Sequence, residues 1–294
     1  MSSPKIIVCG TCAIDITFPA DATTLPLQAN VSAAGTLLNT AILLGIDGHD
    51  VTMVGEVARD TLGGILLRHL QDNGVNITSI DRFSDGGTTP IQLRHTSGGD
   101  IVDYGRYPDQ KFDTVWPRID PDDIVVFGSG FALDPRVRPQ LVELLDNATQ
   151  RNATILYVPD IASSLTRGVT RLMPAILENL ETSHVVFTHK SDIASIFGAV
   201  DARQCYRDKI NFYCPTAVNC DTANGNLELM HPGGYSSKEI SGISTDSVST
   251  QAALLAGFIS SMARLGLTRR DIAGLHNTTA DELITRTLSA VTNH

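Results

Sequence analysis

The stretch IVVFGSGFALDPRVRPQLVELLDNATQRNATILYV, residues 124–158, decides the fold. It opens with a short apolar run at 124–127 and closes with another at 153–158, which is typical of buried strands. Between them, residues 137–152 have the apolar spacing of a helix that buries one face. A strand, a helix and a second strand in this order predict a parallel pair joined by a crossover helix.

The same alternation extends to both sides of this stretch. Apolar runs predict strands at 5–9, 51–54 and 185–188, and helical spacing predicts helices at 36–45, 60–73, 171–180 and 191–197. Gly45, Gly74 and Gly198 are expected to end three of these helices. Repeated strand–helix units predict an α/β fold, a Rossmann-like core with a mostly parallel central sheet flanked by helices.

Two segments interrupt this alternation. Residues 16–31 have no helical period, and residues 88–107 contain two β-like runs around the turn 97–99, Ser-Gly-Gly, which predicts a hairpin. Together they are expected to form a small β-sheet lid on the core. Residues 1–294 are therefore interpreted as a single domain that carries this lid.

Composition limits the class of partner. The formal net charge is -10 and 42% of the residues are hydrophobic, so the chain is globular and has no general attraction for nucleic acid or anionic membranes. No basic segment followed by an apolar one opens the chain, and no apolar run reaches the ~18–20 residues of a membrane span. We therefore expect a cytoplasmic protein. The five scattered cysteines form neither a disulfide framework nor a metal-ligand pattern, so no metal site is expected.

Four motifs occur in a characteristic order. They are IIVCGTCAID at 6–15, AGTLLN at 34–39, GEVARDTLG at 55–63 and DSVSTQAALLAGF at 246–258. In order and spacing they resemble the pfkB (ribokinase-like) family of carbohydrate kinases, and especially its fructokinase-like branch. The resemblance implies a ribokinase-like fold that transfers a phosphoryl group from ATP to a sugar hydroxyl, with the sugar held between lid and core.

The sugar-side positions of the family are largely present. The resemblance implies substrate contacts for Asp15, Gly35, Asn39 and Asp60. Each polar residue also has a structural alternative: Asp15 could cap local backbone amides, Asn39 could be a packing residue on an apolar helix, and Asp60 could cap its own helix. The resemblance favours ligand contact for Asp15, whereas capping is the favoured role for Asp60.

The phosphate-side positions depart from the family pattern. In the family, a G-A-G-D segment supplies an anion hole from helix N-terminal amides and an aspartate as general base, which suits the chemistry of phosphoryl transfer. Here the anion-hole positions are Ser249, Thr250 and Gln251, and the base position is Ala252, whose methyl group accepts no proton. Asp246 is the candidate substitute base.

The motifs that order metal and nucleotide in the family have changed as well. The N-x-x-E segment reads His189 to Asp192, so only the final carboxylate is kept, and His189 is interpreted as a loop residue. The nucleotide-supporting turn runs from Asn219 to Gly225, with Asp221 in place of a glycine near the expected phosphates. That negative charge is unfavourable for a triphosphate.

Two functions follow from this pattern. The first is a family member that binds a sugar or related polyol but has lost efficient phosphoryl transfer. The second is an active carbohydrate kinase that uses ATP and Mg²⁺ with a relocated base such as Asp246. No cofactor is certain, and a homodimer through the β lid is a possible assembly.

Overall fold

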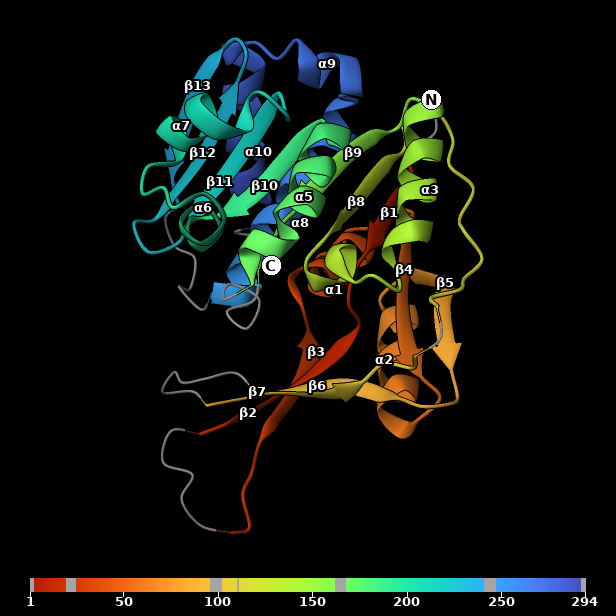
Figure 1. The fold of residues 1–294 in the computed structure, drawn as a ribbon. Coiled ribbons are helices and arrows are strands. Elements are labelled where there is room, and N and C mark those ends of the chain that lie inside the picture. The colour runs from red at the N-terminus through yellow and green to blue at the C-terminus, as the bar shows by residue number, and fades with distance from the viewer. Residues whose placement is uncertain are drawn as a thin grey trace.

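A nine-stranded sheet forms the centre of the molecule (Figure 1). The computed structural model describes residues 3–19, 25–95, 102–109, 111–161, 168–240 and 247–291. Along the sheet the strand order is β13-β12-β11-β10-β9-β8-β1-β4-β5. The strands are β1 (Ile6–Cys9), β4 (Val51–Ala58), β5 (Val75–Phe83), β8 (Ile124–Gly128), β9 (Thr154–Val158), β10 (Val185–His189), β11 (Thr216–Asp221), β12 (Asn226–His231) and β13 (Gly234–Glu239). The strands from β11 to β5 pair in parallel, and only β12 and β13 are antiparallel, which confirms the mostly parallel sheet.

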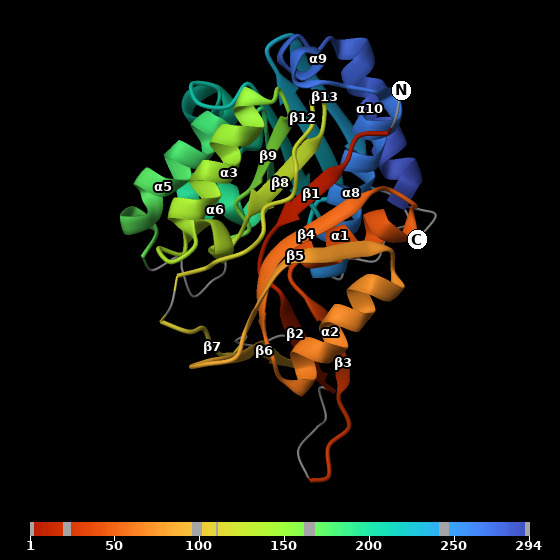
Figure 2. The ribbon, with the colours of Figure 1, turned by 90° about the vertical axis from the view of Figure 1, so that its right-hand side faces the viewer.

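Helices cover both faces of this sheet, as the two views show (Figures 1 and 2). On one face lie α1 (Thr36–Ile46), α2 (Thr61–Asp72), α8 (Ser247–Leu265), α9 (Arg269–Ala273) and α10 (Asn277–Val291). On the other face lie η1 (Gly130–Leu133), α3 (Arg138–Gln150), α5 (Val169–Thr182), α6 (Lys190–Phe197), α7 (Ala202–Cys205) and the π-helical turn η2 (Tyr206–Ile210). Successive residues of β1 enter opposite cores: Ile6 and Val8 pack with α8, and Ile7 and Cys9 with α3. The α/β class predicted from the strand–helix alternation is confirmed.

A second sheet, here called the lid sheet, stands beside the main one. It contains β2 (Ala13–Phe18), β3 (Asn30–Ala34), β6 (Thr88–His95) and β7 (Val102–Arg106), in the order β3-β2-β6-β7. β6 and β7 are antiparallel, as expected for the 88–107 segment, although the turn itself lies outside the described residues. β2 begins at Ala13 and β3 ends at Ala34, so the lid strands exceed the 16–31 segment at both ends.

Two local expectations differ from the structure. Gly45 does not end its helix, since α1 continues to Ile46. Gly45 instead permits close packing, because a Cβ there would lie 2.2 Å from the carbonyl oxygen of Asn73. Asp15 lies inside the lid strand β2, ahead of residue 16, where the first lid segment was expected to begin. Strands β5, β11, β12 and β13 had no counterpart among the sequence predictions.

None of the helices in the described part of the chain is both long enough and apolar enough to cross a membrane. All five cysteines are buried free thiols.

Candidate functional site

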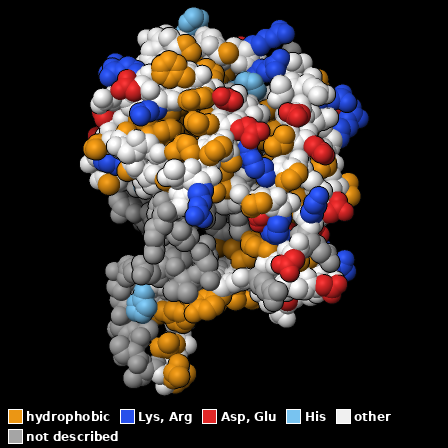
Figure 3. Space-filling view, in the orientation of Figure 1, with side chains coloured by type: hydrophobic (Ala, Val, Ile, Leu, Met, Phe, Trp, Pro, Cys, Tyr) orange, Lys and Arg blue, Asp and Glu red, His pale blue; other side chains and the backbone are white. Residues whose placement is uncertain are grey.

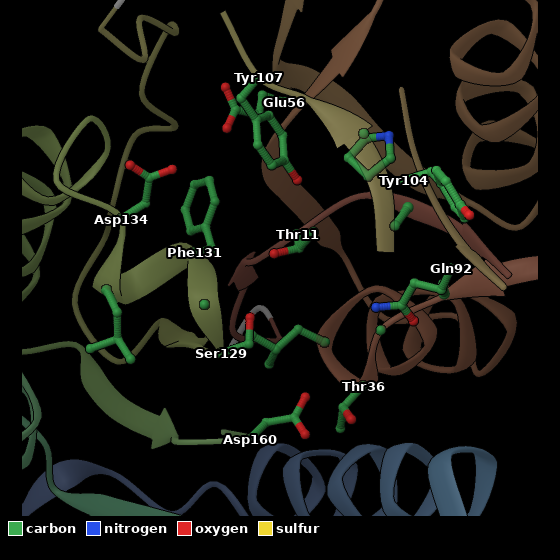
Figure 4. A pocket seen from close by; sticks show the side chains of 18 of the residues that line it. Thr11, Thr36, Glu56, Gln92, Tyr104, Tyr107, Ser129, Phe131, Asp134 and Asp160 are labelled. Carbon is green, nitrogen blue, oxygen red and sulfur yellow. The ribbon is translucent and has the colours of Figure 1, made fainter. Parts of the chain in front are cut away.

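A cavity of about 610 Å³ lies between the lid sheet and the core (Figure 4). Residues from both sheets and from the start of α1 line it: Thr11, Ala13, Ala34, Gly35, Thr36, Leu37, Glu56, Pro90, Gln92, Arg94, Tyr104, Gly105, Tyr107, Ser129, Gly130, Phe131, Leu133, Asp134, Pro135, Asp160 and Leu172. A volume of this size suits a small-molecule ligand, and a largely apolar wall with few polar groups is typical of such sites.

The floor of the cavity is built where β8 and β9 end and α1 begins. Ser129 and Asp160 follow these two adjacent parallel strands, because the carboxyl ends of parallel strands meet at one edge of a sheet. Thr36, the first residue of α1, faces them (Figure 4). Burial and the nearby Asp192 raise the pKa of Asp160 to about 6, although a hydrogen bond with Thr36 opposes the rise.

A buried ion-pair network forms another wall. The guanidinium of Arg136 contacts both carboxylate oxygens of Glu56, at 2.8 and 3.4 Å, and Asp134 at 2.7 Å. It also lies over the ring of Tyr107, 4.9 Å from its centroid. Burial raises the pKa of Glu56, and the contact with Arg136 opposes this rise. The network joins the segment after β7 to the core, since Arg136 also donates to the carbonyl of Pro108.

On the lid side, Arg94 stands between Asp15 and the cavity. Arg94 Nε lies 2.7 Å from Asp15 Oδ2, while Arg94, and not Asp15, lines the cavity. The contact is an ion pair without hydrogen-bond geometry, and Asp15 Oδ1 has no hydrogen-bond partner among the described residues. The lid thus presents a guanidinium to a ligand, together with the amide of Gln92. Among the described residues no backbone amide donates a hydrogen bond to Asp15, so the alternative in which it caps local amides has no support.

Of the other predicted sugar-side residues, one lines the cavity. Gly35 does so at the N-cap of α1 with φ 107°, a conformation that favours glycine. Asn39 donates to the carbonyl of Ala33 at 3.3 Å and is not a lining residue.

Asp60, placed among the substrate-binding residues, lies at the N-cap of α2. Its carboxylate accepts hydrogen bonds from Gly63 N at 2.8 Å and from the amide and hydroxyl of Thr89 at 2.8 and 2.7 Å. Burial raises the pKa of Asp60, but these hydrogen bonds outweigh it and hold the pKa below its ordinary value. Asp60 does not line the cavity. Its hydrogen bonds cap α2 and connect that helix to the start of β6, which is the structural role weighed against ligand contact.

Asp192, the carboxylate kept from the family's N-x-x-E segment, accepts hydrogen bonds from backbone amides with both of its oxygens. Asp192 accepts from Ile161 N at 3.0 Å and from His189 N at 2.9 Å, one oxygen each. Burial raises its pKa, and these two donors oppose the rise. His189 caps α6, accepting from Ser191 N, and burial lowers the pKa of its imidazole. Both side chains therefore hold the start of α6 in place.

The predicted nucleotide turn joins β11 to β12 and borders a second cavity of about 360 Å³. Asp221 does not carry a free negative charge there: Lys190 Nζ lies 2.8 Å from it, and Asn224 donates to both its oxygens. Burial raises the pKa of Asp221, but these donors outweigh it and lower the pKa. Asn219 is similarly engaged, donating to Glu228 at 2.9 Å. Gly225 occupies the turn with φ 66°.

The segment expected to form the anion hole and base lies at the start of α8. Ala252 is fully buried, and its carbonyl accepts a hydrogen bond from Thr40 of α1 at 3.3 Å. Thr250 and Gln251 are also buried. Because α8 begins at Ser247, the N–H groups of Gln251 and Ala252 lie where a helix uses them internally. Ser249 lies in the first turn, and Asp246 is outside the described residues.

These residues do not fit the ATP and Mg²⁺ that the family pattern implies. Asp192 has each oxygen bonded to a backbone amide, and no carboxylate stands at position 252. The second cavity is lined by Asp201, Asp221 and Glu228 against one cation, Lys190, and excess negative charge opposes a triphosphate. In the described ranges no group of three His, Cys, Asp or Glu side chains gathers to hold a metal ion.

The sequence reasoning missed the polar groups that line the cavity. Asp160 had a usable signal, since it is a carboxylate directly after a buried strand of a parallel sheet. Glu56 lies in a quoted motif but was not singled out. Arg94, and Arg136 behind the wall, carried no such signal, because Asp15 and Glu56, with which they pair, are distant in the sequence.

Comparison with known proteins agrees with this architecture. Residues 3–209 match the family described as pfkB family carbohydrate kinase, so the match ends before α8. The search of curated proteins found no match.

Solved structures share the fold at low sequence identity. Aminoimidazole riboside kinase from Salmonella enterica, complexed with aminoimidazole riboside and an ATP analog, superposes with a TM-score of 0.79 at 17% identity, covering 98% of this chain and 92% of that chain. Fructokinase from Vibrio cholerae O395, with fructose, ADP and calcium ion bound, gives 0.78 at 14% identity, covering 99% and 91%. Fructokinase with bound ATP from Xylella fastidiosa gives 0.77 at 15% identity, covering 99% and 93%. With the family matched over most of its length and the fold shared throughout, this chain belongs to the pfkB family of carbohydrate kinases.

Proposed function

We propose that this chain binds a sugar or related polyol in the cavity between lid and core and has lost efficient phosphoryl transfer. One observation carries the proposal: the cavity is retained, whereas the position of the general base is Ala252, buried against α1. Removing a general base costs about 10²–10⁴-fold in rate. Removing oxyanion-type donors costs about a further 10²–10³-fold.

The nucleotide side supports the same proposal. Lys190, a cation that could attract phosphate, is paired with Asp221, and Asp192 is used by backbone amides. A nucleotide would have to break these contacts before it gained any of its own. The expected ligand is therefore a small polyhydroxylated molecule without a nucleotide partner.

The test is a thermal-shift and calorimetric screen of the pure protein with sugars, polyols, ATP and ADP, with and without Mg²⁺. Stabilisation by a sugar but not by nucleotides is expected. An assay for ADP release runs beside it, with the Ala252→Asp variant as comparison. ATP-dependent phosphorylation of a sugar, abolished by Asp15→Asn in a folded protein, would overturn the proposal.

A second candidate function is an active carbohydrate kinase with a relocated base, using ATP and Mg²⁺. Asp246 remains a proposal for that base. Among the described residues Asp160 favours this candidate, because it lines the cavity and its pKa of about 6 lies close to the range of a general base. Product formation that Asp160→Asn removes while sugar affinity is kept would support it.

We also propose a homodimer through the lid sheet. β3 is an edge strand of that sheet, and Leu25, Val31 and Tyr104 are exposed on the lid and the segment leading to it. Figure 3 shows hydrophobic side chains along this lower part of the molecule. Light scattering should give twice the chain mass, and Val31→Asp should return it to the monomer value. A monomer at all concentrations would contradict this assembly.

A further inference from the structure

The charge balance of the cavity restricts the kind of ligand it can bind. Its wall carries three carboxylates, Glu56, Asp134 and Asp160, and one guanidinium, Arg94. Behind the wall, Arg136 pairs with the first two carboxylates, and Asp15 pairs with Arg94. Four carboxylates thus face two guanidiniums, which disfavours an anionic ligand and favours a cationic one.

One of the two excess negative charges lies at Asp160, and the other is shared by Glu56 and Asp134, which have Arg136 as their common partner. The neighbours of Asp160 are Thr36 of α1, Asp192 of α6 and His189 at the end of β10. Asp192 repels it and the His189 imidazole attracts it, although burial lowers the pKa of that imidazole. The nearby Lys190 is paired with Asp221. Within the described ranges, then, no ion pair supplies a cation to Asp160, and a half-buried carboxylate in this situation is stabilised by a cationic partner.

The backbone at the cavity floor is held in an unusual conformation. Ser129 has φ 52° and ψ −162°, and Asp160 has φ 43°. Positive φ is uncommon for residues other than glycine, and such residues cluster at ligand sites. Ser129 is fixed there by its N–H, which donates to the carbonyl of Val158 at 2.9 Å. Two successive strand ends therefore hold a hydroxyl and a carboxylate at the same floor (Figure 4).

This floor has the chemistry of an ammonium site. A protonated primary amine donates three hydrogen bonds. Asp160, Ser129 and Thr36 offer a carboxylate and two hydroxyl oxygens, and all three line the cavity. The remaining wall, with Phe131 and Tyr107, can pack against a carbon skeleton (Figure 4).

We propose that the ligand carries a protonated amine bound by Asp160, Ser129 and Thr36, so that it is an amino sugar or another amine-bearing polyol. This rests on the function proposed above and narrows its ligand class. The amine of the ligand forms an ion pair with Asp160, and the hydroxyl groups of the ligand contact Gln92 and Arg94 on the lid side.

The test compares matched ligand pairs by calorimetry at pH 7.5: glucosamine with glucose, galactosamine with galactose, and glucamine with sorbitol. A charge-assisted contact should make at least one amine bind about 10- to 100-fold tighter than its neutral partner. Asp160→Asn should abolish that preference, so that the amine and its neutral partner bind equally well. Asp134→Asn is the matched control, because this carboxylate already pairs with Arg136, and it should keep the preference. Thermal melts establish that both variants fold.

The outcomes separate the inference from the function on which it rests. Equal binding of amine and neutral ligands, or an unchanged preference in Asp160→Asn, overturns the inference and leaves sugar binding intact. Tighter binding of an acid such as gluconate overturns it as well. Phosphorylated product that disappears in Asp160→Asn assigns the residue to proton transfer and also overturns it. If no sugar or polyol in the panel binds, the proposed function fails, and the inference fails with it.

Discussion

Replacing Asp160 by asparagine should stabilise the folded protein in a pH-dependent way. Burial moves the pKa of this carboxyl from 3.8 to about 6, so ionising it in the folded chain costs about 3 kcal/mol more than in the unfolded chain. The cost is absent below pH 3.8 and fully present above about pH 6. Asparagine tolerates a positive φ, keeps a hydrogen-bond acceptor near Thr36 and carries no charge.

The sign follows from proton binding. Between the two pKa values the folded chain binds more protons than the unfolded chain, so wild-type stability falls as the pH rises. Asp160→Asn should therefore gain about 3 kcal/mol at pH 8 but only about half of that at pH 5. At pH 8 the melting temperature should rise by about 5 °C. Urea unfolding at pH 5, 6, 7 and 8 measures the gain directly.

Asp134→Asn provides the control for this experiment. It removes a carboxylate from the same cavity, but one that is paired with Arg136 at 2.7 Å, so it should lower stability by up to about 1 kcal/mol. A gain for Asp160→Asn that is equal at pH 5 and pH 8, or no gain at pH 8, would refute the reasoning. The carboxylate would then bear no penalty for its charge.

Three further substitutions test the roles assigned above. Ala252→Asp places a carboxylate at a fully buried position, so it should lower the unfolding free energy by about 3 kcal/mol or more. It should also restore no ADP release, and a stable variant that releases ADP would contradict this. Asp60→Ala removes the cap of α2 and its hydrogen bonds to Thr89, so it should lower the unfolding free energy by about 1–2 kcal/mol and leave ligand affinity unchanged. A loss of ligand affinity without a loss of stability would show that Asp60 binds the ligand. Glu56→Gln leaves Asp134 as the one carboxylate partner of Arg136 among the described residues, which should cost about 1–2 kcal/mol in urea unfolding. An unchanged midpoint would show that the pair with Glu56 contributes little.

Several parts of the candidate site were readable from the sequence. That an alanine stands at position 252, where the resemblance places the base, is a matter of residue identity. The capping role of Asp60 followed from its place before a helical period. Gly35 was expected beside the ligand, and it lines the cavity. These features depend on local sequence, where backbone preference and side-chain reach are confined to a few residues.

Other parts required the arrangement of distant segments. Arg94 covers Asp15 because β2 and β6 pair in parallel, with Asp15 opposite Gln92 and Arg94 two residues further on the same face. A shift of that register by one residue would have put Arg94 on the opposite face and left Asp15 toward the ligand. Lys190 neutralises Asp221 because β10 and β11 end side by side.

The sequence alone therefore determined the strand–helix alternation, the family and the alanine at position 252, because hydrophobic period and residue identity are local properties of the chain. Tertiary structure decided which charges face the ligand. Ion pairs such as Arg136 with Glu56 form between residues far apart in the sequence, and burial, which raises the pKa of Asp160, exists only once the strand ends and helices have packed together.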